Sequence, residues 1–497
     1  MGVFDLFTTA KAPTSVNFAS GGKHALDTVA QQAAAAAARS SAHFPHPVLD
    51  PRVHLLPSVL TFPTAVRNAF PTYSAFLHPR NYLSFYTTHA DSFQSAIAIC
   101  IGFSVYVYVM QEITGNASQV DGLWTFLPVI YTTHFTFFST GTFTWPAPRL
   151  LLLWALHVLW STRLTYNAIR RGMFKKGEED YRWPLLRASM NRITWEIFTI
   201  TFIAPAQNFL LAITALPAYV LSLLARPEYF ANQPTRPTTQ LTPADGILAL
   251  LLITNLTVQF IADHQQQLYQ GFKRGLDITC TKPITLPADK LLLLQGGTSP
   301  AGVVTKNGKA AQQHPDNVPL YHGFTNGDKK RGFVTRGLWA WSRHPNFACE
   351  QTTWWIFYAY TVITFLPPST LIDLGTTPAG ASKIGAVTSK LAAKVAEKIA
   401  VPASLVSPPW WSYIFNYAVL GAVSMNILFL ASTAYSEGVS AGKYPAYASY
   451  QKRVGMFLPV DTLLRGIYYW FVAPDNVRER IEAEVWGAEG SAEKKNN

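Results

Sequence analysis

The sequence predicts an all-α fold, a polytopic transmembrane helical bundle of about seven spans, and three observations lead to this prediction. Charged residues make up only 14% of the 497-residue chain, while aromatic residues make up 13%. The apolar residues stand in long runs instead of alternating with polar ones, which argues against a half-buried sheet. Most basic residues lie in the segments between these runs, as is typical of membrane proteins.

Seven apolar runs are candidate membrane spans, because each approaches the roughly 20 residues that cross a bilayer as a helix. They cover residues 92–110, 123–138, 150–164, 195–224, 246–262, 353–366 and 410–430. The fourth run is too long for one straight span and contains Pro205 and Pro217, so we expect a broken or tilted helix there. These runs define a transmembrane domain over residues 91–470.

Polar segments flank and interrupt this domain. Residues 1–90 contain no spanning run and include an alanine tract, so we expect a low-complexity, flexible arm or a short surface helix. Residues 471–497 are expected to form a charged C-terminal tail. Residues 296–330 are expected to form a mobile loop, and residues 367–409 to carry an amphipathic helix near 382–399.

The charge of the loops predicts both orientation and partners. Basic residues crowd residues 170–192 and 273–336, so both loops are expected on the cytoplasmic side. The formal net charge of +12 is therefore assigned to topology, membrane lipids and a phosphorylated cofactor instead of nucleic acid. The mixed charges of residues 178–183 are expected to be a solvated surface. The histidines and the three widely spaced cysteines predict neither a metal site nor a disulfide framework.

The most informative segment is the basic loop that runs into the sixth apolar run. Pro345 has a fixed φ that suits the first helical turn, so a helix is expected to begin there. The polar side chains around this start are Arg343, His344, Asn346 and Glu350. Donors at a helix N-terminus favour an anion, and a buried carboxylate one turn further in needs a partner. The arrangement suits a nucleotide cofactor, but a capped helix with a locally paired glutamate explains the spacing equally well.

Two other segments contain candidate binding residues. Gln259, Asp263 and Gln267 are four residues apart, so they share one helix face that could bind ribose hydroxyls or a nicotinamide. A solvated helix end is the alternative for this segment. Arg453 and Lys452 could clamp a phosphate, and an interfacial segment on acidic lipid is the alternative there.

Taken together, these segments resemble the steroid 5α-reductase-like membrane family over about residues 120–459. Its parts stand in family order at residues 121–124, 163–164, 179–182, 262–265, 337–339, 342–347, Glu350, 444–450 and 457–459. The Arg-His-Pro-Asn-aromatic element is the most specific of them. Phe347 stands where the family usually has tyrosine, so one hydroxyl is missing.

The resemblance implies a helical bundle in the endoplasmic reticulum membrane that binds NADPH on its cytoplasmic side. Hydride would pass to a carbon–carbon double bond of a steroid-like or other lipid held in the bundle. Together with the helix-face argument, the cofactor-binding residues are expected to be Asp263, Gln267, Arg343, His344, Asn346, Glu350 and Arg453. No catalytic residue is assigned, because the family's acid lies in the N-terminal half, where no residue matches.

Two alternatives to a reductase stay open. Membrane methyltransferases of the isoprenylcysteine or phospholipid type carry a similar Arg-His-Pro element, but they use S-adenosylmethionine and a later acidic pair. Here a single acid, Glu437, stands immediately before Gly438, where those enzymes have two. The other alternative is a non-catalytic membrane protein that keeps the fold.

Overall fold

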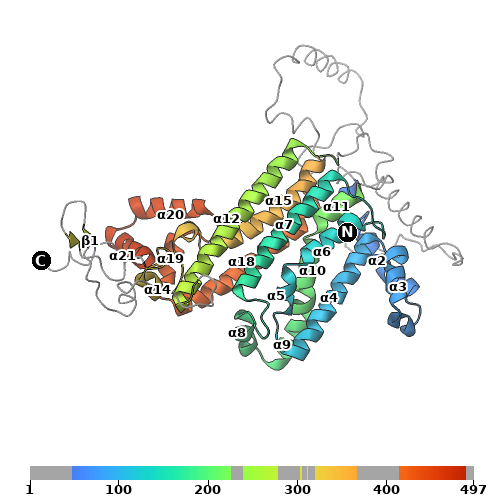
Figure 1. Cartoon of the computed structure of the whole chain (residues 1–497), viewed down its shortest axis with the longest axis horizontal. Helices are drawn as coiled ribbons and strands as arrows, with labels where there is room; N and C mark the ends of the chain where they lie inside the picture. Colours follow the sequence, from blue (N-terminus) through green and yellow to red (C-terminus); the bar gives the residue numbers. More distant parts are fainter. Residues whose placement is uncertain are drawn as a thin grey trace, which may run out of the picture.

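The computed structural model of the protein describes residues 47–224, 239–277, 303–304, 310–311, 320–365 and 414–487. Within these ranges the regular structure is helical, as the sequence predicts, apart from one antiparallel pair of two-residue strands. The strands are β1 (Val303–Val304) and β2 (Ala310–Ala311). Long helices pack side by side in a bundle, and short helices gather beyond one end of it (Figure 1).

Part of the expected flexible arm is helical. Its elements are η2 (Pro47–Leu49), α2 (Leu55–Ala69), η3 (Tyr73–Leu77), α3 (Pro79–Ser84) and η4 (Phe85–His89). Ala69 and Phe85 are buried in a small core, and Gln94 of α4 (Ser92–Thr114) donates to the carbonyl of Ser58 at 3.0 Å. Residues 47–89 are therefore helical instead of flexible, which fits the alternative expectation of a surface helix, because this stretch buries apolar and polar groups against α4. Residues 1–46 lie outside the described residues.

The bundle contains helices at all seven predicted spans. Apart from α4 and the fourth span, these helices are α5 (Gln119–Trp124), α6 (Leu127–Phe137), α7 (Pro148–Arg171), α12 (Pro243–Arg274), α15 (Pro345–Phe365) and α18 (Val419–Lys443). By length and composition, α4, α12, α18 and the helical stretch Arg192–Ile213 are able to cross a membrane. These four helices indicate a membrane protein. The count of seven spans stays a prediction, because α6, α7 and α15 are shorter or more polar.

The fourth predicted span is broken, as its prolines predict. Its pieces are α9 (Arg192–Phe198), the π-helical segment η5 (Thr199–Ala206), α10 (Gln207–Ile213) and α11 (Leu216–Leu223). Pro205 lies inside η5, where a π-helical turn accommodates the missing N–H. The chain turns at Thr214, and Pro217 occupies the first turn of α11.

The helices α7, α12 and α15 form the centre of the bundle, and α12 packs along both of the others. At one end, Arg149 of α7 pairs with Asp245 of α12 at 2.7 Å, and both side chains are buried. Arg149 also donates to Oγ1 of Thr364 in α15 at 3.1 Å. The N-terminal ends of α7 and α12 therefore meet the C-terminal end of α15, so α15 runs antiparallel to the other two.

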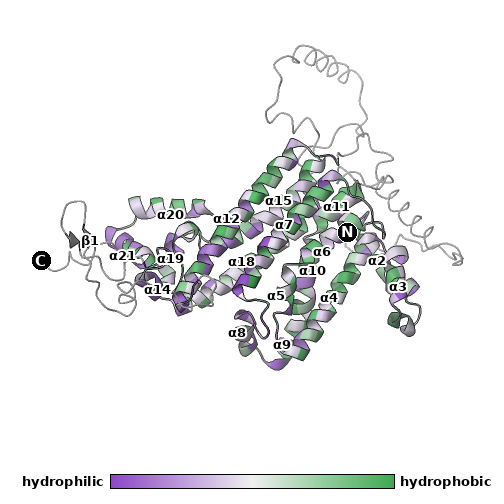
Figure 2. Cartoon of the chain, in the orientation of Figure 1, coloured by the Kyte–Doolittle hydropathy of each residue, from purple (hydrophilic) through white to green (hydrophobic). Residues whose placement is uncertain are grey.

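The opposite end of the bundle, here called the polar end, carries short helices. They are α14 (Asn326–Arg331), η8 (Gly337–Ala340), α19 (Tyr447–Arg453), α20 (Pro459–Phe471) and α21 (Asp475–Trp486). Ile481 and Val485 of α21 are buried beside Tyr450 of α19, so the expected charged tail begins with a docked helix. Hydrophilic residues concentrate in this part of the chain, and hydrophobic ones along the bundle (Figure 2). The amphipathic helix expected near 382–399 lies outside the described residues.

Candidate functional site

A largely buried polar cluster joins α7, α12 and α15 near the polar end. We call it the Arg163 cluster, and its members are Trp160, Arg163, Gln259, Asp263, Asn346 and Glu350. Nη1 of Arg163 lies 2.9 Å from Oδ2 of Asp263, and Nη2 lies 3.2 Å from Oε2 of Glu350. Trp160 and Gln259 also donate to the Glu350 carboxylate, at 2.8 and 2.7 Å. The sequence predicts that Glu350 needs a partner, and the structure provides three donors.

Helical spacing assembles this cluster, because each helix contributes two polar residues three or four positions apart. The pairs are Trp160 with Arg163, Gln259 with Asp263, and Asn346 with Glu350. Asn346 joins the second and third helices, since its Nδ2 donates to Oδ1 of Asp263 and its carbonyl accepts from Gln259, both at 3.1 Å. The predicted polar face of α12 is therefore confirmed, and it faces α7 and α15.

A second cluster lies where α15 begins. We call it the Glu437 cluster, and its members are Arg343, His344, Glu437 and Gln451. Nε of Arg343 lies 2.6 Å from Oε1 of Glu437, and Nε2 of His344 lies 2.9 Å from the same oxygen. Gln451 donates to the other carboxylate oxygen at 3.0 Å. The sequence predicts donors for an anion at this helix end, and in the structure the Glu437 carboxylate of α18 is that anion.

The backbone around Arg343 is held by the segment that follows α19. The amide nitrogens of Arg343 and His344 donate to the carbonyls of Gly455 and Met456, at 2.9 and 3.0 Å. Nη1 of Arg343 also donates to the carbonyl of Val454. Arg343 is thus bonded through both its backbone and its side chain, and it fixes the start of α15 against α18 and α19.

The loop before Arg343 is fixed against α12. Oε1 of Gln265 accepts from the amide of Leu338 at 2.9 Å, and Tyr450 donates to the carbonyl of Trp339 at 2.6 Å. Gly337 has a φ of +64°, and a Cβ there would lie 2.5 Å from the Gln265 amide. Only glycine permits this combination of backbone conformation and close approach.

Two predicted cofactor-binding residues lie outside both clusters. Arg453 pairs with Glu482 of α21 at 2.8 Å, and its guanidinium lies 4.8 Å from the centre of the Trp486 ring. Gln267 is buried on α12, and its Nε2 lies 3.5 Å from the carbonyl of Arg170, which is the limit of a hydrogen bond. Gln267 extends the polar face of α12, whereas Arg453 belongs to the packing of α19 on α21.

Some buried atoms of these helices lack a hydrogen-bond partner among the described residues. They include Nε of Arg163 and Oε1 of Gln259. In the same two residues, Nη2 of Arg163 and Nε2 of Gln259 both contact Oε2 of Glu350. Arg170 lies two turns after Arg163 on α7 and also has a buried, unpaired Nε. Buried polar atoms are normally paired, so Nε of Arg163 and Oε1 of Gln259 are two groups that could bond to an external polar group.

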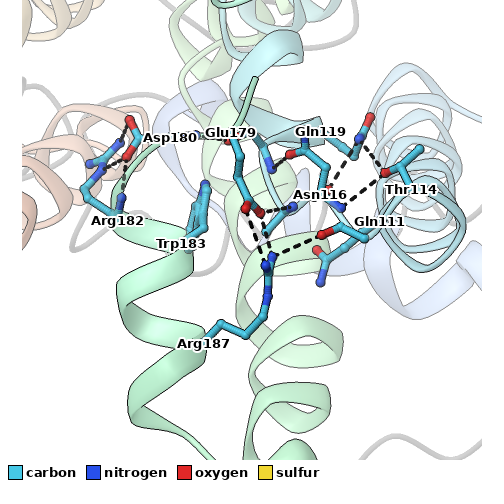
Figure 3. Close-up of polar contacts among 12 residues, drawn as sticks. Gln111, Thr114, Asn116, Gln119, Glu179, Asp180, Arg182, Trp183 and Arg187 are labelled. Carbon is cyan, nitrogen blue, oxygen red and sulfur yellow. Dashed lines mark hydrogen bonds and ion pairs between the residues drawn. The ribbon is translucent and has the colours of Figure 1, made fainter. Parts of the chain in front are cut away.

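A third polar cluster replaces the solvated surface that was expected at residues 178–183 (Figure 3). Glu179 pairs with Arg187 at 2.6 Å and accepts from the amide of Ala117 at 2.8 Å. Asp180 pairs with Arg182 at 2.7 Å. Burial raises the pKa of Asp180, but the hydrogen bonds and charge of Arg182 outweigh burial and hold that pKa below its usual value. The loop is thus tied to the segment after α4.

The same cluster connects Asp121, in one segment that carried the family resemblance, to Trp183, which follows another such segment at residues 179–182. Nε1 of Trp183 donates to Oδ2 of Asp121 at 2.9 Å. Burial raises the pKa of Asp121 above its usual value, because Trp183 compensates only part of the lost hydration. The contact orders the loop between α7 and α8 (Arg182–Ser189) and is separate from the Arg163 cluster.

Sequence reasoning named Asp263, Asn346 and Glu350 as binding residues, but it placed Arg163 only in a family-like segment and did not predict its contacts with Asp263 and Glu350. Arg163 lies 187 positions before Glu350, so no local pattern pairs the two residues. The available signal was an arginine inside the short apolar run 150–164, one turn from Trp160. A charge inside such a run calls for a partner elsewhere in the bundle.

Comparison with known proteins gives a family. Residues 107–372, just over half of the chain, match the family described as "Protein of unknown function (DUF1295)". The chain belongs to that family. The DUF1295 match contains the whole Arg163 cluster and Arg343, whereas Glu437 and Gln451 lie beyond it.

One relative of this DUF1295 protein is "Uncharacterized protein C594.04c" of Schizosaccharomyces pombe. It is 29% identical over 346 residues, which cover 70% of this chain and 73% of the relative. No solved structure matches the chain.

Proposed function

We propose that this protein is a membrane-embedded, NADPH-dependent reductase that transfers a hydride to a carbon–carbon double bond of a steroid-like or other lipid. In this proposal DUF1295 is a branch of the steroid 5α-reductase-like proteins. The observation that carries it is the Arg163 cluster, in which Arg163 and Gln259 both contact Oε2 of Glu350 and each keeps one unpaired polar atom. The Arg-His-Pro-Asn element at residues 343–346 supports the same assignment.

The donor set fits the parts of a nicotinamide dinucleotide. A primary carboxamide offers an N–H donor and a carbonyl acceptor, which complement Oε1 of Gln259 and Nε of Arg163. The carboxylate of Asp263 accepts hydrogen bonds and would suit ribose hydroxyls. Arg170, on the same face of α7 and with a free Nε, would supply positive charge for a phosphate.

The remaining predicted residues take positioning roles in this proposal. Arg343 and His344 are bonded to Glu437, so they would hold the start of α15 instead of touching the cofactor. Glu350, buried by Trp160 and Gln259, would keep Arg163 in place and exclude water from the site.

NADPH, when bound, would supply the hydride. The lipid would lie further from the polar end, among the apolar side chains of α7 and α15, because the Arg163 cluster bounds that apolar region on the side of the polar end. Location in the endoplasmic reticulum, with the polar end in the cytoplasm, belongs to the same proposal. It is supported by the basic ends of α7 and α12, which lie together where Arg170 contacts His264 at 3.2 Å.

The test is equilibrium binding of NADPH to the full chain purified in detergent, with S-adenosylmethionine as the rival ligand. We expect micromolar NADPH binding that Gln259→Met weakens about 5- to 10-fold, as the loss of a hydrogen bond predicts. A positive result justifies screening lipid enones for NADPH oxidation.

Gln111→Met is the matched control. Gln111 of α4 is also buried, donates one side-chain hydrogen bond to Thr199 at 2.8 Å and has an unpaired Oε1, but it lies in the other half of the bundle. It should leave NADPH affinity unchanged. Tight S-adenosylmethionine binding, or binding of neither ligand, would overturn the reductase proposal.

A further inference from the structure

The helix α20 has an apolar face that nothing in the described chain covers. Its exposed side chains are Leu463, Leu464, Ile467, Tyr468, Trp470 and Phe471, each of them more than half exposed. Thr462 alone is buried on this helix. Six large apolar side chains on one 13-residue helix form a contiguous patch, which a soluble surface rarely tolerates.

The opposite face of α20 is firmly attached to the polar end. Oγ1 of Thr462 donates to the carbonyl of Trp341 at 2.6 Å and accepts from the amide of Gly455 at 2.7 Å. Arg465 donates to the carbonyl of Gln451 at 2.8 Å and pairs with Asp461 at 2.9 Å. These bonds fix the rotation of α20 about its axis. Because the bonded side chains face the polar end, the apolar face points outward.

The length and composition of α20 identify what covers this face. At about 1.5 Å per residue, 13 residues reach only about 20 Å, too short to cross the roughly 30 Å hydrocarbon core. Tyr468, Tyr469 and Trp470 end the helix with rings typical of the membrane–water interface. In Figure 1, α20 runs across the direction of α12 and stands clear of the bundle.

The connection to the bundle places α20 beside a bilayer. Residues 444–458 are all that separates its start from the end of α18, one of the helices able to cross a membrane. An apolar face that points outward near the end of a membrane span is well placed to contact the lipid at the membrane surface.

We propose that α20 lies in the plane of the membrane at the polar end, with its apolar face in the boundary between headgroups and acyl chains. Through Thr462 and Arg465 it links that boundary to the Glu437 cluster, because Trp341 and Gln451 adjoin Arg343 and Glu437. The bilayer surface thereby sets the position of the loop that begins α15. This inference does not depend on the reductase proposal.

The test measures collisions of a nitroxide label at position 464 with oxygen and with a water-soluble nickel chelate. The full chain, with Cys100, Cys280 and Cys349 replaced by alanine, carries Leu464→Cys and is placed in phosphatidylcholine nanodiscs. We expect oxygen access several-fold above nickel access, as for a label at Leu250, which is apolar and exposed on α12. A label at Glu479, exposed on α21, should show the reverse.

Two results would overturn the proposal. Nickel access at position 464 equal to that at 479 would mean that the face lies in water. Low access to both reagents, with dipolar broadening between labels, would mean that a second copy of the chain covers it. Ile467→Cys serves as a second reporter, because the Ile467 side chain is exposed on the same face of α20.

Discussion

Nη2 of Arg163 lies 3.2 Å from Oε2 of Glu350, although 187 residues separate them in the chain. Both side chains are more than nine-tenths buried. The pair joins the N-terminal half of the bundle to the helix that begins with Pro345. Removing either partner leaves a charge in a poorly solvated place, and the first prediction follows from that imbalance.

Arg163→Met should lower the free energy of unfolding by about 3–5 kcal/mol, because Asp263 and Glu350 lose their shared cation. Adding Glu350→Gln should recover part of that loss. Thermal unfolding of detergent-purified protein measures both effects. Arg182→Met provides the comparison, since its pair with Asp180 is more exposed and should cost about 1 kcal/mol or less. If Arg163→Met and Arg182→Met lowered the free energy of unfolding equally, burial would not explain the strength of the Arg163 pairs.

Glu437→Ala should loosen the start of α15, because Arg343 and His344 lose the carboxylate that both contact. The amide protons of these two residues are bonded to the carbonyls of Gly455 and Met456. We expect their hydrogen exchange to accelerate by at least about tenfold, equivalent to 1.4 kcal/mol of local stability. Glu437→Gln, which keeps one acceptor, should give a smaller change. Unaltered exchange in the alanine variant would show that the backbone bonds suffice.

Gly332→Ala should destabilise the polar end. Gly332 has a φ of +89°, and a Cβ there would clash with the ring of Tyr444. Gly275→Ala is the matched control, since its φ is +73° but no atom lies within 4 Å of the new Cβ. Both variants pay backbone strain of about 1 kcal/mol, and only the first adds a clash. A melting temperature no lower for Gly332→Ala than for Gly275→Ala would argue against the Tyr444 contact.

The pair formed by Asp180 and Arg182 should make stability depend on pH. Because the pKa of Asp180 is lowered in the folded state, its stabilisation is present above the unfolded pKa of about 3.9 and is lost as the pH falls through the folded value. The melting temperature of Asp180→Asn should therefore lie below that of the wild type at pH 7, by the equivalent of about 1 kcal/mol, and the gap should close below about pH 4. If the difference in melting temperature did not change with pH, the charge of Asp180 would not be the source of the stabilisation.

Local physics explains what the sequence predicted well. The start of α15 at Pro345 follows from the fixed φ of proline, and the π-helical segment around Pro205 follows from its missing N–H. The positions of the helices followed from apolar runs, which depend only on neighbouring residues. The shared face of Gln259 and Asp263 followed from a spacing of four.

Long-range partners account for most of what the sequence did not predict. The pairing of Glu437 with Arg343 crosses 94 residues, and Arg453 was assigned to a phosphate because Glu482 could not be placed beside it. The loop at Glu179 looked solvated because its acceptor role toward Ala117 depends on tertiary packing. The burial of a side chain depends on the whole fold, so a local charge pattern does not predict it.

Two buried ion pairs join α7 to α12, one at Arg149 with Asp245 and one at Arg163 with Asp263. A relative slide of one helical turn, about 5.4 Å, would separate both pairs at once. Both ion pairs therefore oppose shear between these two parallel helices, and we expect the two helices to move together. In the proposed reductase, a lateral opening for the lipid would therefore not separate α7 from α12.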